Sequence, residues 1–119
     1  MLRRLLLNSF LHLAILVLPT GQAFAKDNAE TRHSGVSRVV VFADVHGAYE
    51  NLTAILRQVG IIDERNNWSG GDSYLVSTGD ILDRGPRSRE ALDLLMSLQT
   101  QAGKTGGRVL LALGNHEMM

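Results

Sequence analysis

Three short apolar runs alternate with two segments in which apolar residues recur every three or four positions. The runs cover residues 38–43, 73–77 and 108–113, and each has the length of a β-strand. The first run is continuous and β-branched, which is typical of a strand covered on both faces. The segments between the runs predict helices at about residues 49–59 and 85–103, each with a glycine at its end. This alternation predicts an α/β fold with a βαβαβ arrangement around a parallel sheet.

Residues 1–25 do not belong to this pattern. They contain Arg3 and Arg4, an apolar stretch that ends at Pro19, and the sequence Ala-Phe-Ala at residues 23–25, which fits a signal-peptidase site. We therefore expect a cleaved signal peptide and export of the protein, so that it is periplasmic or secreted. The apolar stretch is shorter than the roughly 20 residues that a transmembrane helix needs, so we expect no stable membrane anchor after cleavage. An uncleaved N-terminal anchor is the alternative.

Composition narrows the functional classes. The 119 residues contain 12 Lys and Arg, 12 Asp and Glu, and no cysteine. Loss of residues 1–25 removes two arginines and no acidic residue, and the slightly acidic remainder argues against nucleic-acid binding. The lack of cysteine excludes disulfide scaffolds, zinc ribbons and thiol nucleophiles, so any metal would have oxygen and nitrogen ligands. Residues 26–37 are polar and without periodicity, and they predict a flexible lead-in to the folded part.

A polar cluster follows each predicted strand. Because parallel strands end at the same edge of a sheet, we expect the three clusters to meet there. Each cluster alone is compatible with a helix cap, a surface histidine or a local ion pair. Together they would crowd carboxylates at one edge, where divalent cations would remove the repulsion. The clusters are Asp44-Val45-His46-Gly47, Gly79-Asp80-Ile81-Leu82-Asp83-Arg84-Gly85 and Gly114-Asn115-His116-Glu117.

The side chains in these clusters indicate a class of chemistry. Carboxylate, imidazole and amide oxygen suit Mn²⁺, Fe or Zn²⁺, and a pair of such ions is a common device for hydrolysing phosphoesters. The glycines beside them suit tight turns and close approach of the backbone to an ion or a phosphate. We therefore expect two divalent metal ions as cofactors, with Mn, Fe and Zn all compatible, and a phosphorylated substrate.

In this order, the three clusters resemble the first three motifs of the calcineurin-like metallophosphoesterases. The sequence Asp83-Arg84-Gly85 resembles the phosphoprotein-phosphatase branch, and residues 68–119 are similar to the Shewanella-like protein phosphatases in particular. The resemblance covers about residues 39–119. It implies that residues 38–119 form the N-terminal part of a metallophosphoesterase-type α/β sandwich, incomplete at its C-terminal side.

The resemblance also implies a set of metal ligands. Asp44 and His46 would bind the first ion, Asp80 would bridge the two ions, and Asn115 would bind the second ion and touch the phosphate. A hydroxide that bridges the ions would attack phosphorus in line, so no phosphoenzyme is expected.

The remaining polar residues would serve the phosphate and the leaving group. Arg84 would hold phosphate oxygens with its planar guanidinium. His116 would be the general acid that protonates the leaving oxygen, and Asp83 would hold its imidazole in position. Glu117 belongs to the third motif but has no metal role in the family, so we expect a structural role for it.

The family has further metal-binding histidines and a further phosphate-binding arginine after the third motif. We therefore expect this chain to be the N-terminal part of a longer phosphatase. One alternative is a catalytically incomplete fragment with at most weak metal binding. Another is a nucleotide phosphohydrolase of the diadenosine-tetraphosphatase type, which shares the Asp-Arg-Gly motif, so a phosphoprotein, a nucleotide and a small phosphomonoester are all open as substrates.

Overall fold

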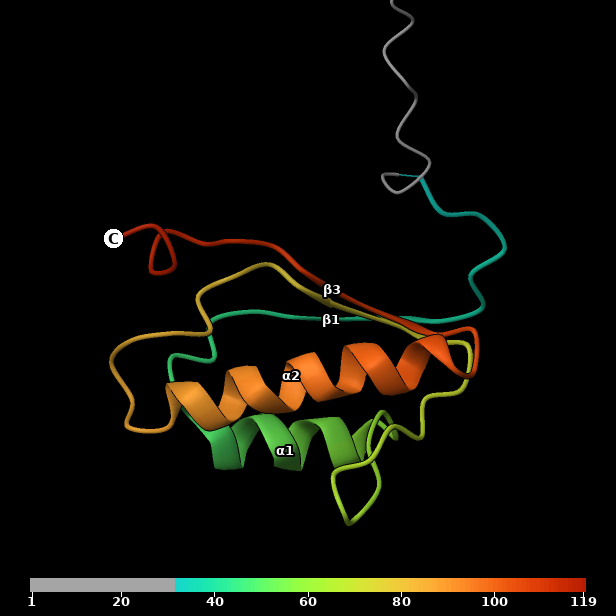
Figure 1. The fold of residues 1–119 in the computed structure, drawn as a ribbon, viewed down its shortest axis with the longest axis horizontal. Helices are drawn as coiled ribbons and strands as arrows, with labels where there is room; N and C mark the ends of the chain where they lie inside the picture. The colour runs from blue at the N-terminus through green and yellow to red at the C-terminus, as the bar shows by residue number, and fades with distance from the viewer. Residues whose placement is uncertain (1–31) are drawn as a thin grey trace, which may run out of the picture. The chain divides into compact units, whose positions relative to one another are not determined.

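The computed structural model describes residues 32–119, which form three strands and two helices (Figure 1). Their order is β1 (Val39–Phe42), α1 (Tyr49–Gln58), β2 (Tyr74–Ser77), α2 (Ser88–Gly103) and β3 (Arg108–Leu111). The predicted βαβαβ arrangement is confirmed, with each strand slightly shorter than its apolar run. The predicted signal peptide and the first part of the lead-in lie outside the described residues. Within residues 32–119, neither helix is long and apolar enough to cross a membrane.

The three strands form one parallel sheet with β2 between β1 and β3. Phe42 pairs with Ser77, and Ser77 pairs with Leu111, so the last residues of the strands are level with one another. The loops that follow β1, β2 and β3 therefore begin side by side at the carboxyl edge of the sheet, where open α/β folds bind their ligands.

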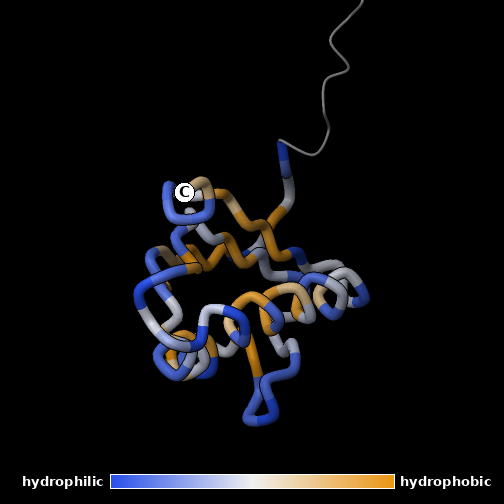
Figure 2. The backbone as a smooth tube through the Cα atoms, turned by 60° about the vertical axis from the view of Figure 1, so that its left-hand side comes forward, coloured by the Kyte–Doolittle hydropathy of each residue, from blue (hydrophilic) through white to orange (hydrophobic). Residues whose placement is uncertain are grey.

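Both helices cover the same face of the sheet (Figure 1). Right-handed crossovers that move in one direction across a sheet, as the order β1-β2-β3 requires, place their helices on one side. In Figure 2, where the tube is coloured by the hydropathy of each residue, the strands are mainly hydrophobic and the loops are mainly hydrophilic. The core between helices and sheet includes Leu52 and Leu56 of α1, Leu75 of β2, and Leu95 and Leu98 of α2, all of them buried.

The other face of the sheet is open in the described part of the chain. Val39 and Val41 of β1 are 53% and 60% exposed, whereas the alternate residues Val40 and Phe42 pack against the core. The prediction of a first strand covered on both faces is therefore wrong for residues 32–119. The physical reason is that both crossover helices lie on the side of Val40 and Phe42.

Neither helix begins with a capping side chain. The N-cap residues are Ala48 for α1 and Arg87 for α2, and neither makes a side-chain capping hydrogen bond. Asp44 and Asp80 are therefore not the N-caps of α1 and α2, and their place in the loops needs another explanation.

Candidate active site

Three loops meet at the carboxyl edge of the sheet. We call them loop 1 (residues 43–48), loop 2 (residues 78–87) and loop 3 (residues 112–119). Backbone hydrogen bonds join loops 1 and 2, so that the pairing of β1 with β2 continues beyond the ends of the strands. His46 N–H donates to Asp80 O (3.0 Å), Gly47 N–H donates to Ile81 O (2.9 Å), and Gly85 N–H donates to His46 O (2.7 Å).

Four glycines allow the loops to approach so closely. A Cβ atom on Gly47 would lie 2.6 Å from Gly85 O, and a Cβ atom on Gly79 would lie 2.2 Å from Gly114 N. Gly47 and Gly79 also have φ angles of +71° and +108°, which residues with side chains rarely adopt. One glycine pair thus sits between loops 1 and 2, and the other sits between loops 2 and 3.

The candidate residues also have an unusual backbone. Outside glycine, six of the described residues have a positive φ, and only Asn66 among them lies outside the candidate site. Such conformations cost free energy in residues with a Cβ atom and are concentrated at functional sites. The other five are Asp44, His46, Asp80, Asp83 and Arg84, with φ between 46° and 69°.

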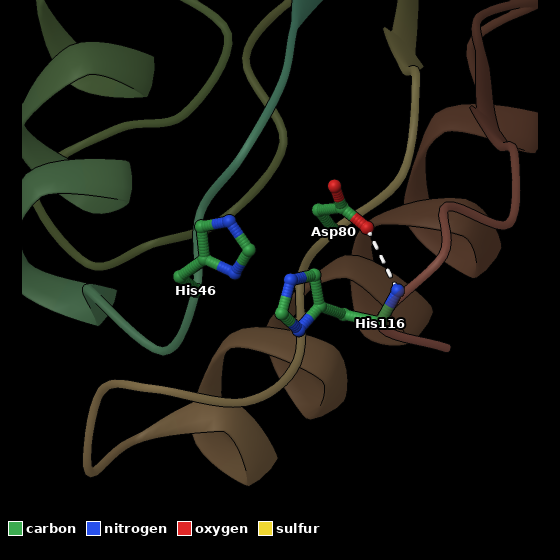
Figure 3. Close-up of side chains that lie close together, drawn as sticks. All are labelled: His46, Asp80 and His116. Atoms are coloured by element: carbon green, nitrogen blue, oxygen red, sulfur yellow. Dashed lines mark hydrogen bonds between the residues drawn. The ribbon is translucent and has the colours of Figure 1, made fainter. Parts of the chain in front are cut away.

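His46, Asp80 and His116 come together from the three loops (Figure 3). One potential ligand atom from each residue lies within 4.8 Å of the other two, and all three residues are half-buried. The imidazole rings of His46 and His116 meet nearly edge to face, with their centroids 4.6 Å apart. The backbone N–H of His116 donates to Asp80 Oδ1 at 3.0 Å. One carboxylate and two imidazoles are donors that suit Mn, Fe or Zn, so the residues present fit a divalent metal ion.

The other two metal ligands expected from the resemblance lie on the same loops. Asp44 of loop 1 is exposed and lies outside the group of three. Asn115 of loop 3 is exposed and directly precedes His116. His116 itself is the unexpected member of the group, because the resemblance assigns it proton donation and the structure places its ring among the potential metal ligands.

Asp83 and Arg84 flank the imidazole of His116. His116 Nδ1 lies 3.1 Å from Asp83 Oδ2, and Arg84 Nη2 lies 3.4 Å from His116 Nε2. The backbone N–H of Arg84 and the imidazole of His116 lower the pKa of Asp83, so this carboxylate is ionised at neutral pH and accepts a hydrogen bond from Nδ1–H of His116. In neutral His116, Nε2 is then the unprotonated nitrogen that faces Arg84. The structure thus brings together the three residues expected to bind phosphate and transfer a proton.

Glu117, for which a structural role was expected, joins loop 3 to loop 2 through hydrogen bonds that the sequence did not predict. Its carboxylate accepts hydrogen bonds from the backbone N–H groups of Asp80, Ile81, Leu82 and Gly114, at 2.7 to 3.1 Å. Burial by itself raises the pKa of Glu117, but the four N–H groups outweigh that effect and lower it to about 2. No spacing in the sequence indicates these contacts, because three of the partners are 35 to 37 residues away.

Residues 37–119 match the calcineurin-like phosphoesterase family. The chain belongs to this family. Among solved structures, this calcineurin-like phosphoesterase chain is similar to the cold-active protein-tyrosine phosphatase of a psychrophilic Shewanella species. The TM-score is 0.70 and the identity is 45%, over 71% of this chain and 26% of that chain.

Two curated relatives represent different kinds of phosphatase. The chain is 34% identical over 102 residues to Shewanella-like protein phosphatase 2 of Arabidopsis thaliana, which is 86% of this chain and 26% of the relative. It is 37% identical over 78 residues to a symmetrical bis(5'-nucleosyl)-tetraphosphatase of an Enterobacter species, which is 66% of this chain and 23% of the relative. The chain of this calcineurin-like phosphoesterase therefore spans about a quarter of the length of the relatives it matches.

Proposed function

We propose that this protein is a metal-dependent phosphoester hydrolase that uses two divalent metal ions. The observation that carries the proposal is the meeting of His46, Asp80 and His116 at the carboxyl edge of the sheet, where side-chain atoms of two expected metal ligands and of the expected proton donor lie within 4.8 Å of one another. Membership of the calcineurin-like phosphoesterase family supports the same class. Asp44, His46, Asp80 and Asn115 would hold the ions. When bound, the ions would neutralise the carboxylates, polarise the phosphate and supply an activated water for hydrolysis.

The chain's own residues account for phosphate binding and proton transfer. A phosphate that enters the site offers Arg84 charged oxygen acceptors, which bind a guanidinium more strongly than a neutral imidazole does. Arg84 would then hold the phosphate oxygens, and Nε2 of His116 would be free to carry the proton that the leaving oxygen takes up. Asp83 holds Nδ1 of the same ring, so the imidazole stays oriented while Nε2 gains and loses its proton.

The proposed substrate is a phosphorylated protein. Two protein phosphatases support this class: the Shewanella protein-tyrosine phosphatase is 45% identical, and the Arabidopsis protein phosphatase matches 86% of this chain, whereas the tetraphosphatase matches 66%. The second candidate is a dinucleoside tetraphosphate, and it is supported by the tetraphosphatase relative. Comparing kcat/KM for a phosphotyrosine peptide and for a symmetrical dinucleoside tetraphosphate separates the two. A higher value for the tetraphosphate would favour the second candidate.

Hydrolysis of p-nitrophenyl phosphate by the whole protein, with and without Mn²⁺, tests the general proposal. Asp80→Asn removes the central negative charge, yet its amide oxygen can still accept the hydrogen bond from His116 N–H. We expect it to lower kcat by about 10²-fold or more, as loss of a group that stabilises developing charge does. The matched control is Asp72→Asn, an exposed carboxylate just before β2 and therefore at the opposite edge of the sheet. Hydrolysis that Mn²⁺ does not stimulate, or full activity in Asp80→Asn, would refute the proposal.

We also propose export, with residues 1–25 as a cleaved signal peptide and residues 26–37 as the lead-in to the catalytic part. The support is the pattern of arginines, apolar stretch and Ala-Phe-Ala sequence. Mass spectrometry of the mature protein should then find Lys26 at its N-terminus, and a chain that still begins at Met1 would contradict cleavage.

A further inference from the structure

The hydrogen bonds between loops 2 and 3 differ in kind from those between loops 1 and 2. Within residues 32–119, no backbone N–H of loop 2 or loop 3 donates to a backbone oxygen of the other loop. The pairing of β2 with β3 ends at Ala112 N–H, which donates to Ser77 O at 2.9 Å. Beyond that point, side chains must hold the two loops together if Asp80 and His116 are to keep their separation.

The carboxylate of Glu117 makes the largest set of such contacts. Its Oε2 accepts hydrogen bonds from the backbone N–H groups of Asp80 and Gly114, both at 2.8 Å. Its Oε1 accepts from Ile81 N–H at 2.7 Å and from Leu82 N–H at 3.1 Å. Hydrogen bonds to an ionised acceptor are stronger than those between neutral groups. One side chain of loop 3 therefore takes the place that a backbone ladder has between loops 1 and 2.

The residues on either side of these contacts are those of the candidate site. Asp80 offers its N–H to Glu117, and its Oδ1 accepts the N–H of His116, the residue directly before Glu117. Loop 2 thus donates to loop 3 through Asp80 N–H and Glu117, and loop 3 donates to loop 2 through His116 N–H and Asp80 Oδ1. A shift of the Glu117 side chain would change the distance between the Asp80 carboxylate and the His116 ring.

We propose that Glu117 is a positioning residue for the hydrolysis proposed above, on which this inference rests. Its carboxylate sets the separation between loop 2 and loop 3 and so places Asp80 relative to His46 and His116. It does not itself reach the substrate or a metal ion, because both of its oxygens are engaged by backbone N–H groups.

Two substitutions change different properties of this carboxylate. Glu117→Gln keeps the shape, but in either orientation its NH₂ group faces two backbone N–H donors, so two hydrogen bonds are lost and donors are set against donors. Glu117→Asp keeps the charge, but it is one methylene shorter and cannot reach all four donors while the backbone of loop 3 stays in place. The matched control is Glu64→Gln, which removes the same charge from an exposed side chain between α1 and β2.

The experiment compares wild type, both Glu117 variants and Glu64→Gln as whole proteins. It measures kcat and KM for p-nitrophenyl phosphate with Mn²⁺, Mn²⁺ affinity by isothermal titration calorimetry, and the melting temperature. Groups that orient metal ligands are typically worth about 10–100-fold in metal affinity or activity. We therefore expect Glu117→Gln, at a temperature where it is fully folded, to lower kcat by about 10–100-fold with little change in KM. We expect its Mn²⁺ affinity to fall by a similar factor, and Glu64→Gln to match wild type.

The inference would be overturned if Glu117→Gln melts at a lower temperature but keeps wild-type kcat and Mn²⁺ affinity. That result would show that Glu117 has a structural role only. If Glu117→Gln does not fold, Glu117→Asp takes its place, with an expected loss of about 10-fold, and wild-type values would overturn the inference in the same way. If wild type hydrolyses no phosphoester, the proposed function fails. The Mn²⁺ affinities of wild type and variants then still test the positioning role by themselves.

Discussion

Gly114 of loop 3 lies against the Asp80 carboxylate, and Gly114→Ala tests how closely the site is packed. A Cβ atom at this position would lie 2.1 Å from Asp80 Oδ1 and 2.7 Å from Asp80 Cγ. Nonbonded heavy atoms are in favourable contact at about 3.5 Å, so the carboxylate or loop 3 must move by more than about 1 Å. Overpacking of this kind costs about 1–3 kcal/mol of the free energy of unfolding. A displacement of about 1 Å at a catalytic group can lower the rate by about 10²-fold.

We therefore expect Gly114→Ala to lower kcat for p-nitrophenyl phosphate by about 10²-fold and to destabilise the protein by about 1–3 kcal/mol in urea denaturation. Gly103→Ala is the matched control, because a Cβ atom on this last residue of α2 would meet no heavy atom within 4 Å. The control should keep full activity and gain about 0.5 kcal/mol, since alanine favours the helix. Wild-type kcat in a folded Gly114→Ala protein would refute the close packing of Asp80 against loop 3.

Two further predictions concern stability, and urea denaturation measures both. Leu95→Ala, at a completely buried position of α2, should lower the free energy of unfolding by about 2–5 kcal/mol. Met96→Ala, at a neighbouring position that is 55% exposed, should lower it by less than about 1 kcal/mol. Equal losses in the two variants would contradict the assigned core. Hydrogen bonds from the backbone N–H of Asn67 and, to a smaller extent, from that of Arg65 lower the pKa of Asp63 below its usual 3.8. The ionised side chain therefore stabilises the fold above pH 3.8, and this contribution is lost as the pH falls through the folded pKa. Asp63→Asn should therefore be less stable than wild type at neutral pH and equally stable well below the folded pKa, and a difference that does not change with pH would contradict this.

The local features of the chain were predictable from its sequence. The apolar run at residues 38–43 and the helical spacing at residues 49–59 correspond to β1 and α1 within one or two residues. Local periodicity reports which faces of an element are apolar, and glycines mark where elements end, so neither prediction needs tertiary information. The open face at Val39 and Val41 was not predictable in this way, because it depends on where the crossover helices lie.

The sequence by itself determined the order of strands and helices, their parallel arrangement, and the gathering of three polar clusters at one edge of the sheet. It could do so because parallel strands all end on the same side, whatever the details of packing. Only the tertiary structure decided that His46, Asp80 and His116 lie within ligand distance of one another and that Asp44 lies outside their group. It also decided the position of Glu117, whose partners on loop 2 are more than thirty residues away along the chain. Such contacts depend on how closely the loops approach one another and on the left-handed backbone conformation of their residues. Neither property can be predicted from a local pattern of residues.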